Sequence, residues 1–148
     1  MGDHPDVRAP GVTAHGRLSF SIPDQRAELE SLFCASTCFV MPSWLEAFGI
    51  VYVEAAAAGL PSIGTTVGGT ETSIGDGGIL VDPADDRGLL EAMRQLAEPQ
   101  FAHKLGTRAR QRADAFTWRA CAERVVRAFA PDLADDLGMA DFLSVQHR

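Results

Sequence analysis

One segment of the sequence has residue types and spacing suited to chemistry: two glutamates, Glu46 and Glu54, with seven residues between them. Glu46 precedes a predicted helix, and Glu54 lies about one turn inside it. The N–H groups of residues 48–50 lack intrahelical partners at this helix start, where phosphate and other anions bind readily. A carboxylate accepts hydrogen bonds from two hydroxyl groups, as a sugar or ribose diol presents them. These groups match the parts of a nucleotide sugar.

The segments around this pair predict an α/β fold. Solid apolar runs alternate with helical patterns, which is typical of a Rossmann-like parallel sheet with helices on both faces. Strands are expected at 12–15, 37–41, 60–64 and 78–81. Helices are expected at 23–36 and 50–58, followed after residue 83 by three apolar helical stripes that begin at Leu89, Phe101 and Trp118, with 67–78 as a loop. Ligands of such sheets bind beyond the carboxyl ends of the strands, where the glutamate segment begins.

Several helix ends and faces are also predicted. Gly59 is expected to end the helix 50–58 in a left-handed conformation. Thr117 is expected to cap the last helix, whose apolar stripe from Trp118 to Phe129 is predicted to be core packing. Three arginines are expected on a solvated face, with contact to a partner domain as the alternative: Arg108, Arg110 and Arg112.

Composition excludes several classes of function. The chain has 148 residues, a net charge of −7 and a pI near 4.9, which argues against binding driven by nucleic-acid phosphates or an anionic membrane surface. No stretch reaches the ~20 apolar residues of a membrane-spanning helix, and no secretory signal is evident, so a cytoplasmic location is expected. Three cysteines without a Cys-x-x-Cys pair predict neither a disulfide framework nor a zinc site.

Other nucleotide-binding chemistries lack their key residues. The spacing of Gly64 and Gly69 matches half of a phosphate-binding P-loop, but Thr70 stands where that motif needs a lysine. No Gly-x-Gly-x-x-Gly pattern follows a predicted strand, which argues against a dinucleotide oxidoreductase. His15 is expected to be packed or solvated, with ligand contact as the alternative. The two glutamates have an alternative of their own as ordinary surface carboxylates, since acidic residues are common at helix N-termini.

The glutamate segment resembles a known motif. Glu46 and Glu54, in the setting Pro-Ser-x-x-Glu-Ala-Phe-Gly-Ile, are similar to the E-x7-E motif of retaining glycosyltransferases of the GT-B fold, and most closely to family 4. The resemblance continues through Glu-Ala-x-Ala-x-Gly-x-Pro at 54–61, Val-Gly-Gly at 67–69, Gly-Ile-Leu-Val-Asp-Pro-x-Asp at 78–85 and Phe-Thr-Trp at 116–118. This ordered set covers about residues 12–129.

The resemblance implies a reaction and a set of site residues. The family transfers a hexose from a nucleotide diphosphate sugar to an acceptor hydroxyl with retention, and no metal or other cofactor is expected. Glu46 matches the glutamate at the donor hexose and is the predicted catalytic residue, whereas Glu54 matches the one that holds the ribose hydroxyls. The other implied donor-binding positions are Gly16 near the base, the backbone of Phe48, Gly49 and Ile50 around the sugar and diphosphate, and the pair Gly68 and Gly69, for which a simple turn is the alternative.

Two departures from the family pattern affect these expectations. The family usually has Gly-Gly-x-x-Glu where this chain has Gly-Gly-Thr-Glu at 68–71, so Glu71 is not expected in the usual place. The arginine and lysine that neutralise the departing diphosphate belong to units that nothing before residue 12 can supply, and the only lysine is Lys104. Catalysis by this chain alone is therefore expected to be slow or absent.

The expected organisation has three parts: a disordered lead-in at 1–11, a partial nucleotide-sugar-binding Rossmann-like domain at 12–130, and a tail at 131–148. This corresponds to a truncated GT-B C-terminal domain that acts as the donor-binding portion of a glycosyltransferase. We expect an acceptor domain, a partner chain or self-association to complete it, because a truncated sheet leaves an edge strand to be covered. The alternative is a non-catalytic module for nucleotide-sugar binding or assembly.

Overall fold

The computed structural model describes residues 8–130, and the chain divides into two units, Met1–Ser36 and Thr37–Arg148. This division falls inside the domain expected at 12–130. The expected lead-in lies largely outside the described residues, and the expected tail at 131–148 lies entirely outside them.

The first unit contains one helix, α1 (Pro23–Ala35), within its described residues. Pro23 stands at the helix start, where its fixed φ favours the helix and its missing N–H costs nothing. The strand predicted at 12–15 is wrong, since these residues form no regular structure. A strand needs a hydrogen-bonded neighbour, and the described residues of this unit provide none. His15 contacts Glu28 instead, with Nδ1 and Oε1 2.9 Å apart.

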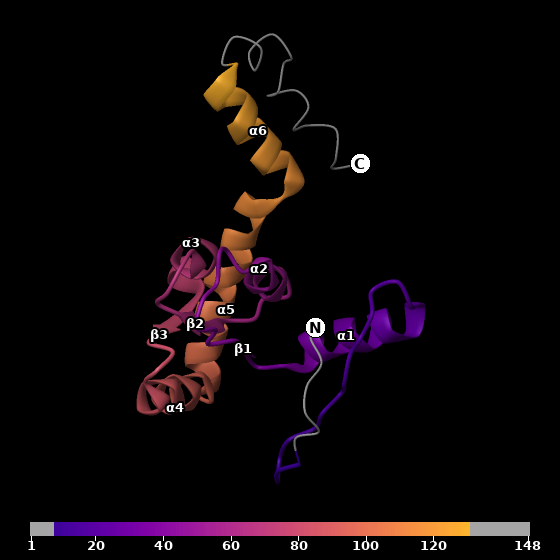
Figure 1. The fold of residues 1–148 in the computed structure, drawn as a ribbon, viewed down its shortest axis with the longest axis vertical. Helices are drawn as coiled ribbons and strands as arrows, with labels where there is room; N and C mark the ends of the chain where they lie inside the picture. Colours follow the sequence, from indigo (N-terminus) through magenta and orange to yellow (C-terminus); the bar gives the residue numbers. More distant parts are fainter. Residues whose placement is uncertain (1–7, 131–148) are drawn as a thin grey trace. The chain divides into compact units, whose positions relative to one another are not determined.

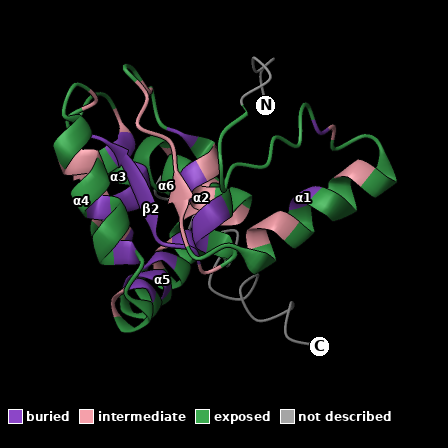
Figure 2. Cartoon of the chain, turned by 90° about the horizontal axis from the view of Figure 1, so that it is seen from below, coloured by how far each residue is buried: buried purple, intermediate pink, exposed green. Residues whose placement is uncertain are grey.

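The second unit is built on a parallel sheet of three strands in the order β1 (Phe39–Val40), β2 (Ser62–Thr65) and β3 (Gly78–Val81). Phe39 pairs with Ser62, and Thr65 pairs with Val81. The central strand β2 is buried along its whole length, as Figure 2 shows in purple. The buried residues of β2 are Ser, Ile, Gly and Thr, whereas the more apolar β1 and β3 are mostly half-buried, so burial and apolar sequence agree only in part.

One face of the sheet packs against α4 (Asp86–Leu96) and α5 (Pro99–Ala113). The core here joins Ile63 and Val81 of the strands to Leu96 and Leu105 of the helices. In Figure 1, α4 lies below the sheet. Helix α5 begins next to α4 and runs along the sheet towards α2 and α3.

The other face packs against α2 (Ile50–Ala57) and α3 (Thr70–Ile74). The ring of Tyr52 in α2 makes an edge-to-face contact with Phe39 of β1, with ring centroids 5.7 Å apart. Gly64 of β2 provides room for Tyr52 and for Ile74 of α3, since a β-carbon at this position would meet both side chains. Helices therefore cover both faces, and the fold class predicted from the sequence is confirmed.

The segment predicted as a loop at 67–78 is only partly a loop. It contains α3 and a 3₁₀ turn, η1 (Gly75–Gly77). The hydroxyl of Thr70 donates a hydrogen bond to the carbonyl of Thr65 and so fixes the start of α3. These short helices span less than two turns, so they leave no apolar periodicity in the sequence.

Both predicted helix caps are confirmed. Gly59 follows α2 with φ +78°, and the N–H groups of Gly59 and Leu60 donate to the carbonyls of Ala56 and Ala55. This pairing is a Schellman motif, which satisfies carbonyl groups at the end of the helix. The hydroxyl of Thr117 accepts a hydrogen bond from the N–H of Ala120, 3.1 Å away, at the start of the last helix.

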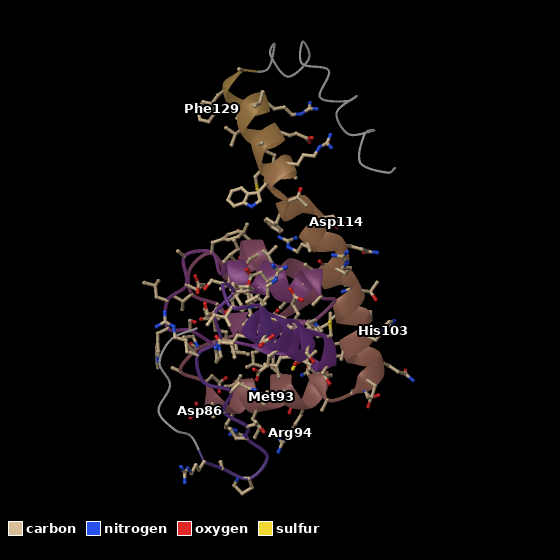
Figure 3. The ribbon with its side chains drawn as sticks, turned by 90° about the vertical axis from the view of Figure 1, so that its right-hand side faces the viewer. Asp86, Met93, Arg94, His103, Asp114 and Phe129 are labelled. Carbon is tan, nitrogen blue, oxygen red and sulfur yellow. The ribbon has the colours of Figure 1, made fainter. Side chains whose placement is uncertain are left out.

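That last helix, α6 (Trp118–Phe129), follows the 3₁₀ turn η2 (Asp114–Phe116) and projects away from the sheet in two views (Figures 1 and 3). The prediction that its apolar stripe is core packing is wrong. Trp118 is 88% exposed and Phe129 is 87% exposed, and the helix has no buried residue. The periodic pattern identifies a face that can be buried, but it does not supply the surface that would cover that face.

None of the helices within residues 8–130 is both long and apolar enough to cross a membrane.

The contrast between α4 and α6 gives a prediction about stability. Leu96→Ala removes a side chain that is 1% exposed, so it is expected to lower the free energy of unfolding by about 2–5 kcal/mol. Phe129→Ala removes a larger side chain that is 87% exposed, and is expected to change it by less than about 0.5 kcal/mol. Urea unfolding of both variants makes the comparison. A cost near 2 kcal/mol for Phe129→Ala would contradict the exposure of α6.

Candidate functional site

The site lies where the segments that follow β1 and β2 meet, at the carboxyl ends of these strands. Glu46, in the segment after β1, forms a parallel β-bridge with Gly68, in the segment after β2. The N–H of Gly69 donates a hydrogen bond to the carbonyl of Glu46 over 2.9 Å. The predicted catalytic glutamate is therefore held through its backbone at the edge of the sheet where ligands of this fold class bind.

The pair Gly68 and Gly69 permits this contact. Gly68 has a φ of +90°, a left-handed conformation that side chains disfavour, and a β-carbon there would collide with the carbonyl oxygen of Glu46. A β-carbon at Gly69 would collide with the carbonyl oxygen of Ala47. The structure thus gives the two glycines a packing role beneath the glutamate segment. Their role in donor binding remains a prediction.

Glu71, two residues after this pair, lies exposed in the first turn of α3.

The start of α2 has the geometry of an anion site, but a carboxylate already approaches it. Gly49 is the N-cap with φ 73° and ψ 64°, in the left-handed region. The N–H of Phe48 donates to Oε1 of Glu46 over a long 3.4 Å. At this distance the hydrogen bond is weak, so a phosphate oxygen competes for the same N–H at little cost.

Tyr52 lies directly beneath this start. Its side chain is 1% exposed, and its hydroxyl donates a hydrogen bond to the carbonyl of Met41 at the end of β1. Burial, and secondarily the nearby negative charge of Glu46, raise the pKa of Tyr52 to about 12. The phenol is therefore neutral throughout the physiological range and stays a hydrogen-bond donor.

Glu54 occupies a different environment from Glu46. Its side chain is exposed, and it makes no hydrogen bond or ion pair with residues 8–130. It lies on the outer face of α2 with Ile50, four residues earlier, which is 63% exposed. The structure therefore leaves the carboxylate of Glu54 open to solvent.

An aromatic and cationic stack supports Phe48, and sequence reasoning missed it. The ring of Phe48 meets that of Phe116 edge-on, with centroids 5.6 Å apart. The guanidinium groups of Arg112 and Arg124 lie 5.6 and 5.7 Å from the centre of the Phe116 ring. The spacing of Arg112 and Phe116, four residues apart at the end of α5, is the sequence signal that could have revealed part of it.

The prediction of a solvated face is wrong for Arg112. Its side chain is half-buried and donates a hydrogen bond to the carbonyl of Thr72 in α3. It passes so close to Gly75 that a β-carbon there would lie 2.5 Å from the guanidinium carbon. Arg112 therefore fastens α3 to the end of α5.

One predicted donor-binding position does not belong to the second unit. Gly16 has φ +68° and belongs to the first unit, whereas Glu46 and the other six predicted donor-binding residues belong to the second. A cavity of about 550 Å³ contains none of the predicted site residues; it is lined by Glu71, Thr72, Gly75, Asp76, Leu80 and Arg112.

Residues 8–130 contain no group of three or more His, Cys, Asp or Glu side chains arranged to hold a metal ion.

The packing role of Gly68 can be tested against a matched glycine. Gly68→Ala and Gly59→Ala both place a side chain in the left-handed region, at a cost of about 1–2 kcal/mol in unfolding free energy. Only at Gly68 does the new β-carbon also meet the backbone of Glu46, since nothing lies within 4 Å at Gly59. Gly68→Ala is therefore expected to be the more destabilising by at least about 1 kcal/mol in urea unfolding. Equal losses would rule out the close contact.

Tyr52 is the only tyrosine, so tyrosinate absorbance reports on it alone. We expect a titration midpoint of about 12 in the folded chain, against about 10 when unfolded. Because folding favours the neutral phenol, its contribution to stability is complete below pH ~10 and is lost as the pH rises towards about 12. Glu46→Gln should lower the midpoint, and Glu54→Gln, the matched control, should not. A folded-state midpoint near 10 would mean that the phenol is solvated.

Comparison with known proteins agrees with the fold. Residues 2–99 match the family described as glycosyl transferases group 1. A D-inositol 3-phosphate glycosyltransferase of Frankia alni is 38% identical over 117 residues, which is 76% of this chain and 28% of the relative. The enzyme of the same name from Corynebacterium diphtheriae is 36% identical over 145 residues, 96% of this chain and 32% of the relative.

Two solved structures have a fold similar to that of this chain. Sucrose-phosphate synthase of Thermosynechococcus elongatus superposes with a TM-score of 0.62 at 36% identity, over 73% of this chain and 28% of the other. WaaG, a glycosyltransferase involved in lipopolysaccharide biosynthesis, gives 0.56 at 27% identity, over 70% and 29%. The chain spans about a third or less of the length of each of these proteins. On the family match over residues 2–99, the chain belongs to the glycosyl transferases group 1 family.

Proposed function

We propose that the second unit is the donor-binding portion of a retaining, family 4-like glycosyltransferase. It would bind a nucleotide diphosphate sugar whose hexose passes to an acceptor hydroxyl. The observation that carries this proposal is the position of Glu46, which is fixed by the bridge to Gly68 beside the N-terminus of α2. A carboxylate and a helix N-terminus side by side suit a sugar linked to a diphosphate.

Each residue then has a defined task. The carboxylate of Glu46 accepts hydrogen bonds from the hexose, and the N–H groups of Phe48, Gly49 and Ile50, around the start of α2, bind the diphosphate. Glu54 accepts both hydroxyls of the ribose, which its exposed carboxylate is free to do. No metal or other cofactor is part of this proposal.

The charge of the departing diphosphate must be stabilised from elsewhere. Residues 37–86, which hold the glutamate segment and the glycine pair, contain no lysine or arginine. Positioned cations are usually the largest contribution to such a reaction. We therefore propose that an acceptor domain or a partner chain supplies them.

The same absence of basic residues favours a second candidate function. A module that binds a nucleotide sugar for sensing or assembly needs the two carboxylates and the helix N-terminus, but it needs no cations to stabilise a leaving group. Hexose transfer in the presence of an acceptor-domain partner would favour the enzyme. Saturable donor binding with no transfer in any such combination would favour the module.

Calorimetric titration of the chain with UDP, GDP, ADP and their sugars tests donor binding. We expect one nucleotide to bind saturably, and Glu54→Ala to weaken its binding at least about tenfold, because hydrogen bonds to a charged group are lost. Glu91→Ala, which removes another exposed carboxylate on α4, is the matched control and should bind as the parent chain does. Failure of a folded chain to bind any of these compounds, or unchanged binding by Glu54→Ala, would contradict the proposal.

A further inference from the structure

We propose that Tyr52 is the positioning residue of this site: it ties the end of β1 to the start of α2 and thereby fixes the segment that carries Glu46. This inference rests on the proposed function for its consequence in donor binding, but its structural part stands without a ligand.

The ring of Tyr52 supports the start of α2. Gly49 has the left-handed conformation of an N-cap, and a β-carbon there would collide with the Tyr52 ring and lie 3.1 Å from Cγ of Glu46. The N–H of Tyr52 also donates a hydrogen bond to the carbonyl of Gly49 over 2.9 Å. The backbone that would bind the diphosphate therefore rests on this ring.

The hydroxyl of Tyr52 fixes the other end of the segment. It donates to the carbonyl of Met41, the residue that follows β1, and the N–H of Met41 donates in turn to Ile63 of β2 over 3.0 Å. One side chain thus bonds to the residue at which the segment leaves the sheet and supports the residue at which it enters α2. Between these points the segment is also attached by the bridge from Glu46 to Gly68 and Gly69 and by the edge-on contact of Phe48 with Phe116.

The two functions of this side chain are separable by substitution. Tyr52→Phe keeps the ring under Gly49 and removes only the bond to Met41. It should leave the start of α2 in place and loosen the segment before it. Tyr52→Leu removes both supports.

Hydrogen exchange of the 148-residue chain, followed by NMR, tests this without a ligand. The N–H of Gly69 is the reporter, because it is bonded to the carbonyl of Glu46. Tyr52→Phe is expected to accelerate its exchange about fivefold or more, the value of one hydrogen bond, and Tyr52→Leu to accelerate it further. Leu96→Ala is the control for a general loss of stability: it disturbs the opposite face of the sheet and should change the Gly69 rate less than twofold. A Gly69 rate in Tyr52→Phe within twofold of the parent chain, or matched by Leu96→Ala, would overturn the proposal.

Binding measurements on the same variants test the consequence for the donor. Since Glu46 is assigned to the hexose, Tyr52→Phe should weaken binding of the sugar nucleotide about fivefold more than binding of the corresponding nucleoside diphosphate. Tyr52→Leu should weaken both. Equal losses in Tyr52→Phe would overturn the assignment of Tyr52 to the Glu46 segment. If the parent chain binds no nucleotide, the proposed function fails, and the exchange rates still decide whether Tyr52 fixes the segment.

Discussion

A backbone contact between Glu46 and the glycine pair at 68–69 is the constraint on which the rest of the site depends. Parallel strands bring their carboxyl ends to one edge of the sheet, but this alone does not fix the segments that follow them. The bridge does so, and it requires a glycine because a β-carbon on Gly68 would occupy the space of the Glu46 carbonyl. The same closeness explains why the two segments can present one surface to a ligand although 22 positions separate Glu46 from Gly68.

Tyr52 and the stack on Phe116 support this surface from below and from the side. Tyr52 contributes an apolar ring to the buried layer and one hydroxyl to the strand end. Phe48 rests on Phe116, which in turn lies against two guanidinium groups. Residues 37–86 contain no lysine or arginine, and the guanidinium groups of Arg112 and Arg124 lie against the Phe116 ring. The unit is thus built to hold carboxylates and N–H groups in place, and stabilisation of leaving-group charge is left to another part of the assembly that we propose.

The sequence predicted the features that local patterns determine. Apolar runs predicted β1 and β3, and the strand expected at 60–64 covers most of β2. Gly59 and Thr117 correctly predicted the end of α2 and the start of α6. Features that depend on distant contacts were missed. The short α3 is stabilised by the hydrogen bond of Thr70 and is too short to show an apolar period in the sequence. Arg112 donates a hydrogen bond to a carbonyl of α3 that lies 40 residues away in sequence.

In the candidate site, too, local patterns were predicted from the sequence, whereas features that depend on distant contacts were not. The motif at 42–54 singled out Glu46 and Glu54, but it could not show that one is fixed at the sheet while the other faces solvent. The stripe of α6 was expected in the core because its period is right, yet burial needs a covering surface that periodicity does not specify. Gly68 and Gly69 were proposed as ligand contacts, and their packing against the glutamate segment became visible only in three dimensions.

Mapping where a nucleoside diphosphate binds tests whether the donor site lies at the start of α2. Amide shifts of the ¹⁵N-labelled chain would be followed by NMR during titration with UDP, GDP or ADP. We expect the largest changes at Phe48, Gly49 and Ile50, with smaller ones at 68–69, because these N–H groups surround the proposed diphosphate position. Changes centred instead on the cavity beside Glu71 and Arg112, with none at the start of α2, would contradict it.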